Sequence, residues 1–396
     1  MIRPIVIAGI ALYAATSAAR PAFEKIALID NFDFITHFDC ETKEGTRQIL
    51  DRVFMTGADS MAWRHQTGGV VRFPTREEPT YLLNGVVDKR RVPDNRVHGR
   101  ARLEVGETNL LAYAIAEAKK LGKGAGIHYT MEENHFAAFT FGLWNMEHPQ
   151  YWTRGISGEP WAGRCSFAFP EVLDHKMRLL DELLDANPDF IYLDPWRRGA
   201  WRPGHEYVEP VLAEWKRRFG AEPPPQDPRD QRWLEVVGSF MERYMRAIKA
   251  RIAAHGGRTR FLLGLADITL ADDNMWRDYA IDWKKYAKEG LVDAVVVSNV
   301  LPGGGDAWAE TRKIYELVMA RRGKADVYFH VSTYDYHYGI PSYCRRTGEK
   351  PEVVAKKLLD LAHAVGGAGV ILECVDYGNY PPAINAILQA DAAKGK

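Results

Sequence analysis

The 396-residue sequence predicts an α/β protein, a single (β/α)8 TIM barrel with long βα loops after strands two, three and four. Three observations predict this fold class. Short apolar runs alternate with amphipathic helical segments, the candidate strands number eight, and no change in composition marks a second domain. The length beyond a minimal barrel is therefore assigned to loops.

The predicted strands are short apolar runs, each followed by a polar or glycine-containing loop. In chain order they cover residues 34–40, 58–64, 126–131, 190–194, 260–266, 294–298, 326–332 and 369–374. Residues 25–29 are an additional candidate. Eight parallel strands are the number that closes a (β/α) barrel.

Amphipathic helices are predicted between the strands, where apolar residues recur every three or four positions. We expect these apolar stripes to pack on the barrel wall. Two of the helices follow a proline, which favours the first helical turn. The stripes are Leu173, Met177, Leu180 and Leu184 after Pro170, then Trp233, Val237, Phe240, Tyr244, Ile248 and Ile252, then Val354, Leu358, Leu361 and Val365 after Pro351.

Three connecting segments are longer than a barrel requires. They cover residues 65–105, 132–169 and 195–227, after the second, third and fourth predicted strands. As βα loops they should gather at the C-terminal mouth of the barrel, where such folds carry their functional residues.

The first 19 residues have the organisation of a signal peptide. Arg3 is followed by an apolar run at residues 5–15 and by small residues at 16–19. We therefore expect residues 20–396 to form the barrel domain of a protein that is exported to the periplasm or to the extracellular space. No other stretch approaches 18 apolar residues, so we predict no membrane span in the mature chain.

Composition excludes several classes of protein. Lys and Arg total 52 and Asp and Glu total 52, a formal net charge of zero. Nucleic-acid binding needs a basic excess, so we predict no nucleic-acid partner. The four cysteines form no CxxC pair, which disfavours a structural zinc site. The sequence contains neither a phosphate-binding loop nor a GxSxG motif, and we predict no cofactor.

The predicted mouth of the barrel is rich in carboxylates, with arginine and aromatic residues around them. Asp194 is the strongest catalytic candidate because it ends a short apolar strand directly before Pro195. Arg197, three residues later, would favour its ionised form. Cleavage of a glycosidic bond needs two carboxyl groups, one to protonate the leaving oxygen and one to attack or to activate water.

Glu373 is the predicted partner of Asp194. It ends the last apolar run, and apolar surroundings favour the neutral carboxyl group that a general acid needs. Strand alternation leaves two orientations open, into the barrel or toward the helices. Asp267, Asp335 and either Glu132 or Glu133 are the alternatives for the second carboxylate.

Other side chains near the predicted strand ends should bind substrate. Five tryptophans lie between residues 144 and 201, where indole rings could stack on sugars or instead pack the loops onto the barrel. The predicted substrate-binding residues are Arg64, His65, Glu132, His135, Trp161, Trp196, Arg197, Asn299, Asp335 and Tyr336.

Two other functions stay open. His65, His128 and His330 lie at strand ends, as in metal-dependent barrel hydrolases, but the HxH pair usual on the first strand is absent and we predict no metal site. A metal-dependent hydrolase or a lyase is therefore one alternative. A carbohydrate-binding barrel without catalytic activity is the other.

Four blocks of sequence resemble the bacterial glycosyl-hydrolase-like TIM-barrel proteins described as family 10-like. They are residues 144–152, 158–161, 167–172 and 189–194, and residues 282–293 add a weaker similarity. The resemblance covers about residues 30–380. It implies processing of glycosides or polysaccharides by a secreted enzyme.

Only Asp194 matches a functional position of that family. After the predicted sixth strand, Ser298 and Asn299 stand where relatives often have an acidic residue. A pair of carboxylates from the fourth and sixth strands is therefore not expected in this chain.

Overall fold

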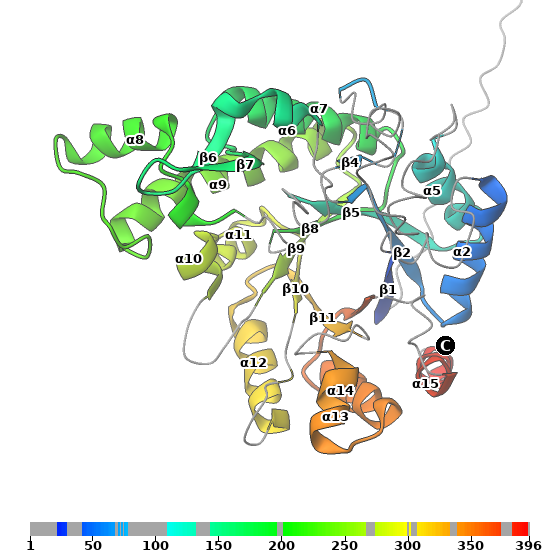
Figure 1. Ribbon diagram of the computed structural model, residues 1–396. Coiled ribbons are helices and arrows are strands. Elements are labelled where there is room, and N and C mark those ends of the chain that lie inside the picture. The colour runs from blue at the N-terminus through cyan, green and yellow to red at the C-terminus, as the bar shows by residue number, and fades with distance from the viewer. Residues whose placement is uncertain are drawn as a thin grey trace, which may run out of the picture.

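A computed structural model of the chain describes residues 22–29, 42–67, 70–71, 73, 75–77, 109–131, 143–195, 201–266, 274–298, 301, 307–332, 339–373 and 382–394. A ring of strands lies at its centre and helices surround the ring (Figure 1). The predicted fold class is confirmed, since eight parallel strands close into a barrel.

The barrel strands follow one another around the ring in the order β1, β12, β11, β10, β9, β8, β5, β2. Each one pairs in parallel with both of its neighbours. Their bounds are β1 Glu24–Ile29, β2 Ser60–Arg64, β5 Gly124–Thr130, β8 Phe190–Asp194, β9 Arg260–Leu265, β10 Ala294–Val297, β11 Asp326–Ser332 and β12 Gly369–Glu373.

The assignment of residues 34–40 as the first barrel strand was wrong. The place belongs to β1, the segment proposed as an additional strand, which pairs with β12 on one side and β2 on the other. All six residues of β1 are buried, because a strand in a parallel barrel is covered on both faces. Residues 34–40 themselves lie outside the described residues.

The helices lie outside the barrel, and their bounds are α2 Lys43–Met55, α5 Leu110–Lys120, α6 Leu143–Glu147, α7 Pro170–Leu184, α8 Glu209–Phe219, α9 Gln231–Ala254, α10 Asn274–Tyr279, α11 Trp283–Glu289, α12 Ala307–Arg321, α13 Ile340–Thr347, α14 Pro351–Ala364 and α15 Pro382–Lys394. Helices α7 and α14 begin at Pro170 and Pro351, as predicted. All six residues of the predicted stripe on α9 are buried against the barrel wall.

Two apolar cores result from the closed sheet. The larger one lies between the strands and the surrounding helices. The smaller one fills the barrel, and its members are Ile26, Leu28, Ala62, Phe190, Tyr192, Leu262, Ala294, Val296, Tyr328 and Ile371. Because side chains alternate along a strand, this second group identifies which positions of each strand point inward.

A polar network closes the N-terminal end of the barrel. Glu24 accepts hydrogen bonds from Ser60 at 2.5 Å and from the Tyr328 hydroxyl at 2.6 Å. Arg260 lies 3.0 Å from the same carboxylate and donates to the Tyr328 hydroxyl at 2.8 Å. The buried Glu24 carboxylate is thus compensated by a cation and by hydroxyl donors, as a buried charge requires.

The segments after β5 and β8 add structure beyond the barrel. The first contains α6 and a hairpin of β6 Trp152–Arg154 and β7 Pro160–Cys165. The second contains α8, which projects to the left of the barrel in Figure 1. A bridge between Arg154 and Glu206 and a hydrogen bond from Tyr207 N to Arg154 O join the two segments.

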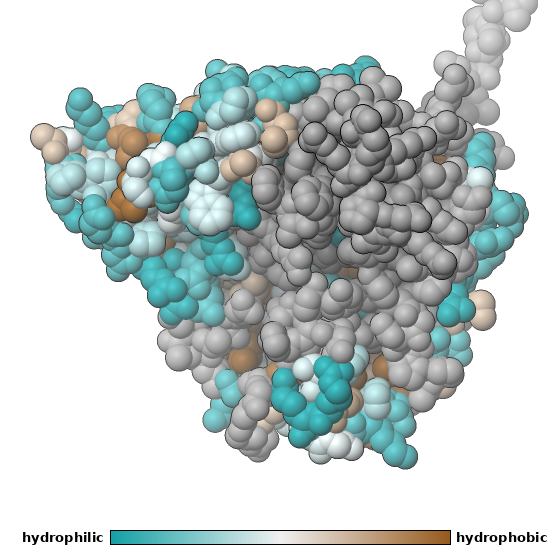
Figure 2. Space-filling model, in the orientation of Figure 1, coloured by the Kyte–Doolittle hydropathy of each residue, from teal (hydrophilic) through white to brown (hydrophobic). Residues whose placement is uncertain are grey.

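The described surface is mostly hydrophilic in the view of Figure 2. Its exposed large hydrophobic residues are Met55, Leu121, Ile156, Trp161 and Val353. Among the helices that the structure describes, none is long and apolar enough to span a membrane.

Candidate functional site

Polar side chains replace apolar ones inside the barrel at the C-terminal ends of its strands. On β8, Phe190 and Tyr192 belong to the inner core, so alternation also turns Asp194 inward. On β12, Ile371 is an inner residue and Glu373 lies two positions later. The two orientations left open for Glu373 are thereby reduced to one, into the barrel.

The strand registers place Asp194 and Glu373 in one layer on opposite sides of the mouth. The pairings add up to an offset of eight residues around the ring, the shear of a TIM barrel. In such a barrel, inward residues of alternate strands share a layer. The top layer therefore consists of Arg64, Asp194, Ser298 and Glu373, contributed by β2, β8, the end of β10 and β12.

Asp194 is held by a histidine of the neighbouring strand. Nε2 of His128 on β5 lies 3.2 Å from Oδ2 of Asp194, and both side chains are almost fully buried. An ionised Asp194 would accept this hydrogen bond from a proton on Nε2 of His128, because a carboxylate has no donor of its own. The His128 ring also stacks on Tyr192, with 5.1 Å between ring centroids. The position of Asp194 is therefore fixed from the layer below it.

Glu373 has a matching set of contacts on the opposite wall. The hydroxyl of Ser332 on β11 donates to Oε2 of Glu373 at 2.8 Å. Nε2 of His330, two residues earlier on the same strand, lies 3.5 Å from that oxygen. Each of the two carboxyl groups is thus held by side chains of a neighbouring strand.

Arg64 adds a positive charge to the layer. It is fully buried, and the register places it beside His128 on the adjacent strand. Its guanidinium is always protonated, so it favours the ionised form of a carboxylate nearby. The expectation that Arg64 faces the mouth is consistent with its position two residues after the inner residue Ala62.

His65 takes a different direction from Arg64. Its ring stacks on Tyr129, a residue of the outer core, with 4.6 Å between centroids, and its Nδ1 lies 3.2 Å from the carbonyl oxygen of His128. Burial lowers the pKa of His65 to about 3, so the ring is neutral at physiological pH. The structure places it toward the helices rather than in the layer of Asp194.

The tryptophans of the long segments have mixed environments. Trp144 stacks on His175 at 4.0 Å and on His148 at 4.3 Å, and Trp201 is only 4% exposed. These two rings pack the segments together. Trp161 on β7 is 39% exposed, although His205 stacks on it at 4.0 Å.

The remaining predicted site residues lie outside the described residues, and their placement stays a prediction. They are Glu132, His135, Trp196, Arg197, Asn299, Asp335 and Tyr336. Of the alternative second carboxylates, Glu133 and Asp267 lie outside as well.

The sequence did not reveal the side chains that hold the two carboxyl groups. From the sequence, His128 and His330 are candidate metal ligands, and Ser332 has no predicted role. Across the part of the chain that the structure describes, no group of three or more His, Cys, Asp or Glu side chains could hold a metal ion. The strand register could have identified both pairs. It aligns Ser332 with Glu373 directly, and it aligns Thr130 with Asp194, which brings His128, two residues earlier on β5, near Asp194.

Neither a family model nor a curated protein matches this chain. Solved structures do match it. The glycoside hydrolase domain of PgaB (BpsB) from Bordetella bronchiseptica is 13% identical with a TM-score of 0.62, over 93% of this chain and 98% of that one. The catalytic domain of a β-amylase from Paenibacillus polymyxa is 10% identical with a TM-score of 0.54, over 96% and 100%.

A third structure has the same fold within a longer chain. The GH20 exo-β-N-acetylglucosaminidase from Vibrio harveyi is 11% identical with a TM-score of 0.51, over 94% of this chain and 54% of that one. At these identities the likeness concerns the fold. The chain therefore has the (β/α)8 barrel fold found in these glycoside hydrolases.

Proposed function

We propose that this protein is a glycoside hydrolase that acts on a poly- or oligosaccharide bound in the mouth of the barrel. The observation that carries the proposal is the placement of Asp194 and Glu373 in one layer, on strands that are four positions apart in a ring of eight. Hydrolysis of a glycosidic bond requires two carboxyl groups on opposite sides of the bond, and the barrel mouth has such a pair. The fold likeness to glycoside hydrolases supports the same class of activity.

Asp194 acts as the general base in this proposal and Glu373 as the general acid. The N–H of His128 stabilises the ionised form of Asp194, and Arg64 in the same layer adds to this effect. Glu373 protonates the leaving glycosidic oxygen, with its carboxyl group oriented by Ser332.

The distance across the mouth favours inversion at the anomeric carbon. Strands spaced about 4.8 Å apart and tilted by about 36° close into a ring about 15 Å across. Asp194 and Glu373 reach inward from opposite walls, and each bonds to a neighbouring strand rather than extending toward the other. This arrangement is closer to the roughly 6.5–9.5 Å between the carboxyl groups of inverting enzymes than to the roughly 5–5.5 Å of retaining ones.

The remaining substrate-binding residues and the export of the enzyme are proposed from the sequence. Residues Glu132, His135, Trp196, Arg197, Asn299, Asp335 and Tyr336 complete the site in this proposal, and the exposed ring of Trp161 stacks on a sugar further out. Residues 1–19 direct export, and residues 20–396 form the mature barrel. The resemblance to family 10-like glycosyl hydrolases supports both the secreted setting and the carbohydrate substrate.

Hydrolysis of a broad glycan panel by the purified protein tests the proposal. Release of reducing ends from at least one glycan is expected, with a loss of at least about 100-fold in Asp194→Asn and in Glu373→Gln, since general acid–base catalysis contributes about 10²–10⁴-fold. Asp360→Asn and Glu316→Gln are matched controls because both side chains are exposed, and these variants should retain the parental rate.

Unchanged hydrolysis in Asp194→Asn would exclude the assignment of that residue. Tight glycan binding without turnover in any condition would instead indicate a binding barrel without catalytic activity. Early-time NMR of the first product anomer checks the stereochemistry, and a product with retained configuration would contradict the inverting arrangement.

A further inference from the structure

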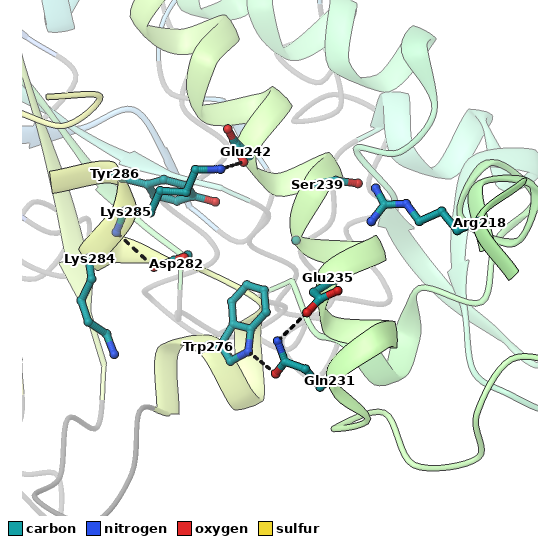
Figure 3. Close-up of a pocket in the computed structure, with 11 residues that line it drawn as sticks. Arg218, Gln231, Glu235, Ser239, Glu242, Trp276, Asp282, Lys284, Lys285 and Tyr286 are labelled. Atoms are coloured by element: carbon teal, nitrogen blue, oxygen red, sulfur yellow. Dashed lines mark hydrogen bonds and ion pairs between the residues drawn. The ribbon is translucent and has the colours of Figure 1, made fainter. Parts of the chain in front are cut away.

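The outer wall of the barrel carries a pocket that is separate from the mouth. It lies between α9 and the pair α10–α11, with the end of α8 nearby (Figure 3), and has a volume of about 600 Å³. Such a volume falls within the range of roughly 300–1,000 Å³ typical of ligand sites. Its lining residues are Arg218, Gln231, Glu235, Gly238, Ser239, Glu242, Trp276, Asp282, Lys284, Lys285 and Tyr286.

A glycine in α9 makes room for the aromatic part of the pocket. A Cβ atom at Gly238 would lie 3.0 Å from Cζ3 and 3.2 Å from Cη2 of Trp276, so glycine lets the indole pack on the helix without having to shift. Nε1 of Trp276 donates to Oε1 of Gln231 at 3.0 Å, and Gln231 donates to Glu235 at 2.9 Å. The indole orientation is thus fixed by packing and by a hydrogen-bond chain.

The acidic and basic side chains of the pocket lining balance in number. Its lining contains three acidic and three basic side chains. Glu242 accepts from Lys285 at 2.7 Å, and Arg246 outside the lining donates to the same carboxylate at 2.6 Å. Asp282 caps α11 by accepting from the backbone N–H of Lys285 at 3.0 Å. Because the acidic and basic side chains of the lining are equal in number, the pocket has little overall preference for an anion or a cation.

The lining therefore selects a ligand that is polar and uncharged. Carboxylate oxygens that already accept one bond retain lone pairs for hydroxyl donors, and the hydroxyl of Ser239, which donates to the carbonyl oxygen of Val236 at 2.6 Å, can accept a further bond. An apolar ligand would displace water from the remaining acceptor sites of these groups without replacing its hydrogen bonds, which is unfavourable. A sugar ring presents hydroxyl groups to such a lining and C–H groups to an indole face.

We propose that this pocket is a second carbohydrate-binding site, which holds a neutral oligosaccharide segment on the flank of the barrel. The inference rests on the proposed function, because a chain that processes a long glycan gains affinity from a second contact with the same polymer. Gln231 begins α9, the helix that leads into β9, so this part of the pocket lies toward the mouth side of the barrel.

NMR titration of the Trp276 indole N–H signal in the Asp194→Asn protein tests the proposal without turnover of the probe. The probes are the neutral tetrasaccharides cellotetraose, maltotetraose and chitotetraose, with tetragalacturonate as an anionic comparison. Trp276→Phe assigns the signal. Ser239→Trp fills the pocket while leaving the Trp276 contacts in place, and Glu316→Gln on α12 is the surface control.

At least one neutral tetrasaccharide should move the indole signal in a saturable manner, and Ser239→Trp should weaken that binding at least about 10-fold. The Glu316→Gln control should bind as the parent does, and the tetragalacturonate should bind more weakly than the neutral probe. An indole signal that none of the neutral probes moves, or an equal response in Ser239→Trp, overturns the proposal.

Hydrolysis measured separately with the unmodified protein distinguishes the two claims. Glycan hydrolysis without any response at Trp276 leaves the proposed function standing and removes the second site. A saturable response at Trp276 without hydrolysis of any glycan leaves the second site standing and removes the proposed activity.

Discussion

Replacing Glu206 by Gln should stabilise the protein above about pH 5, and the gain should grow with pH. Glu206 lies in the segment after β8 and is fully buried. Ser166 donates to its Oε2 at 2.5 Å, and no donor among the described residues reaches its Oε1. Burial raises the pKa of the Glu206 carboxyl group well above its usual range, because the ionised form loses its hydration there.

The size of the effect follows from proton linkage. Below a pH of about 4.3, the usual pKa of Glu, the folded and unfolded states both hold the proton and the residue causes no pH dependence. Above it the unfolded chain releases the proton while folded Glu206 keeps it. The parent protein therefore loses about 1.4 kcal/mol of stability per pH unit, until the raised pKa of the folded state is reached. Gln has the same shape without the titration.

Urea unfolding of the parent and of Glu206→Gln between pH 4 and pH 7 measures this difference. The two should be similarly stable at pH 4, and above pH 5 the variant should gain about 1.4 kcal/mol per pH unit for as long as folded Glu206 keeps its proton. Glu316→Gln, at a position 56% exposed on α12, is the matched control and should show no such trend. A difference between Glu206→Gln and the parent that is independent of pH would refute the buried neutral carboxyl group.

Two further substitutions test other parts of the structure. His128→Asn should reduce kcat at least about 10-fold with little change in KM, because Asp194 loses the side chain that holds it in position. An unchanged kcat would remove His128 as a positioning residue. Gly369→Ala should lower the free energy of unfolding by about 1–3 kcal/mol or more, because a Cβ atom there would lie 1.9 Å from the backbone oxygen of Glu24. Gly204→Ala is the control: its Cβ atom would make only ordinary contacts, so this variant should unfold at the parental urea midpoint.

The architecture was accessible from the sequence because parallel barrel strands are buried on both faces and read as apolar runs. The runs at 190–194 and 326–332 coincide with β8 and β11. The error at the first strand has a physical origin. Both residues 25–29 and 34–40 contain apolar side chains, and the choice depends on pairing with β12, which lies more than 300 residues away in the chain.

The site could be predicted from the sequence only in part, because its contacts also depend on how distant strands pair. Asp194 could be identified because a proline follows it directly at a strand end. The orientation of Glu373 could not, since alternation alone leaves two faces and only the barrel register identifies Ile371 as an inner residue. The contact between His128 and Asp194 likewise depends on the alignment of β5 with β8, a pairing between residues that are 66 positions apart.

The crystal structure of the Glu373→Gln variant with a bound oligosaccharide shows directly whether Asp194 and the residue at position 373 face the same glycosidic bond. We predict a glycosidic oxygen within hydrogen-bond reach of the residue at position 373, with Asp194 on the opposite face of the adjoining sugar ring and room for a water molecule between them. An oligosaccharide that binds elsewhere and leaves the space between these two residues to solvent would contradict the account.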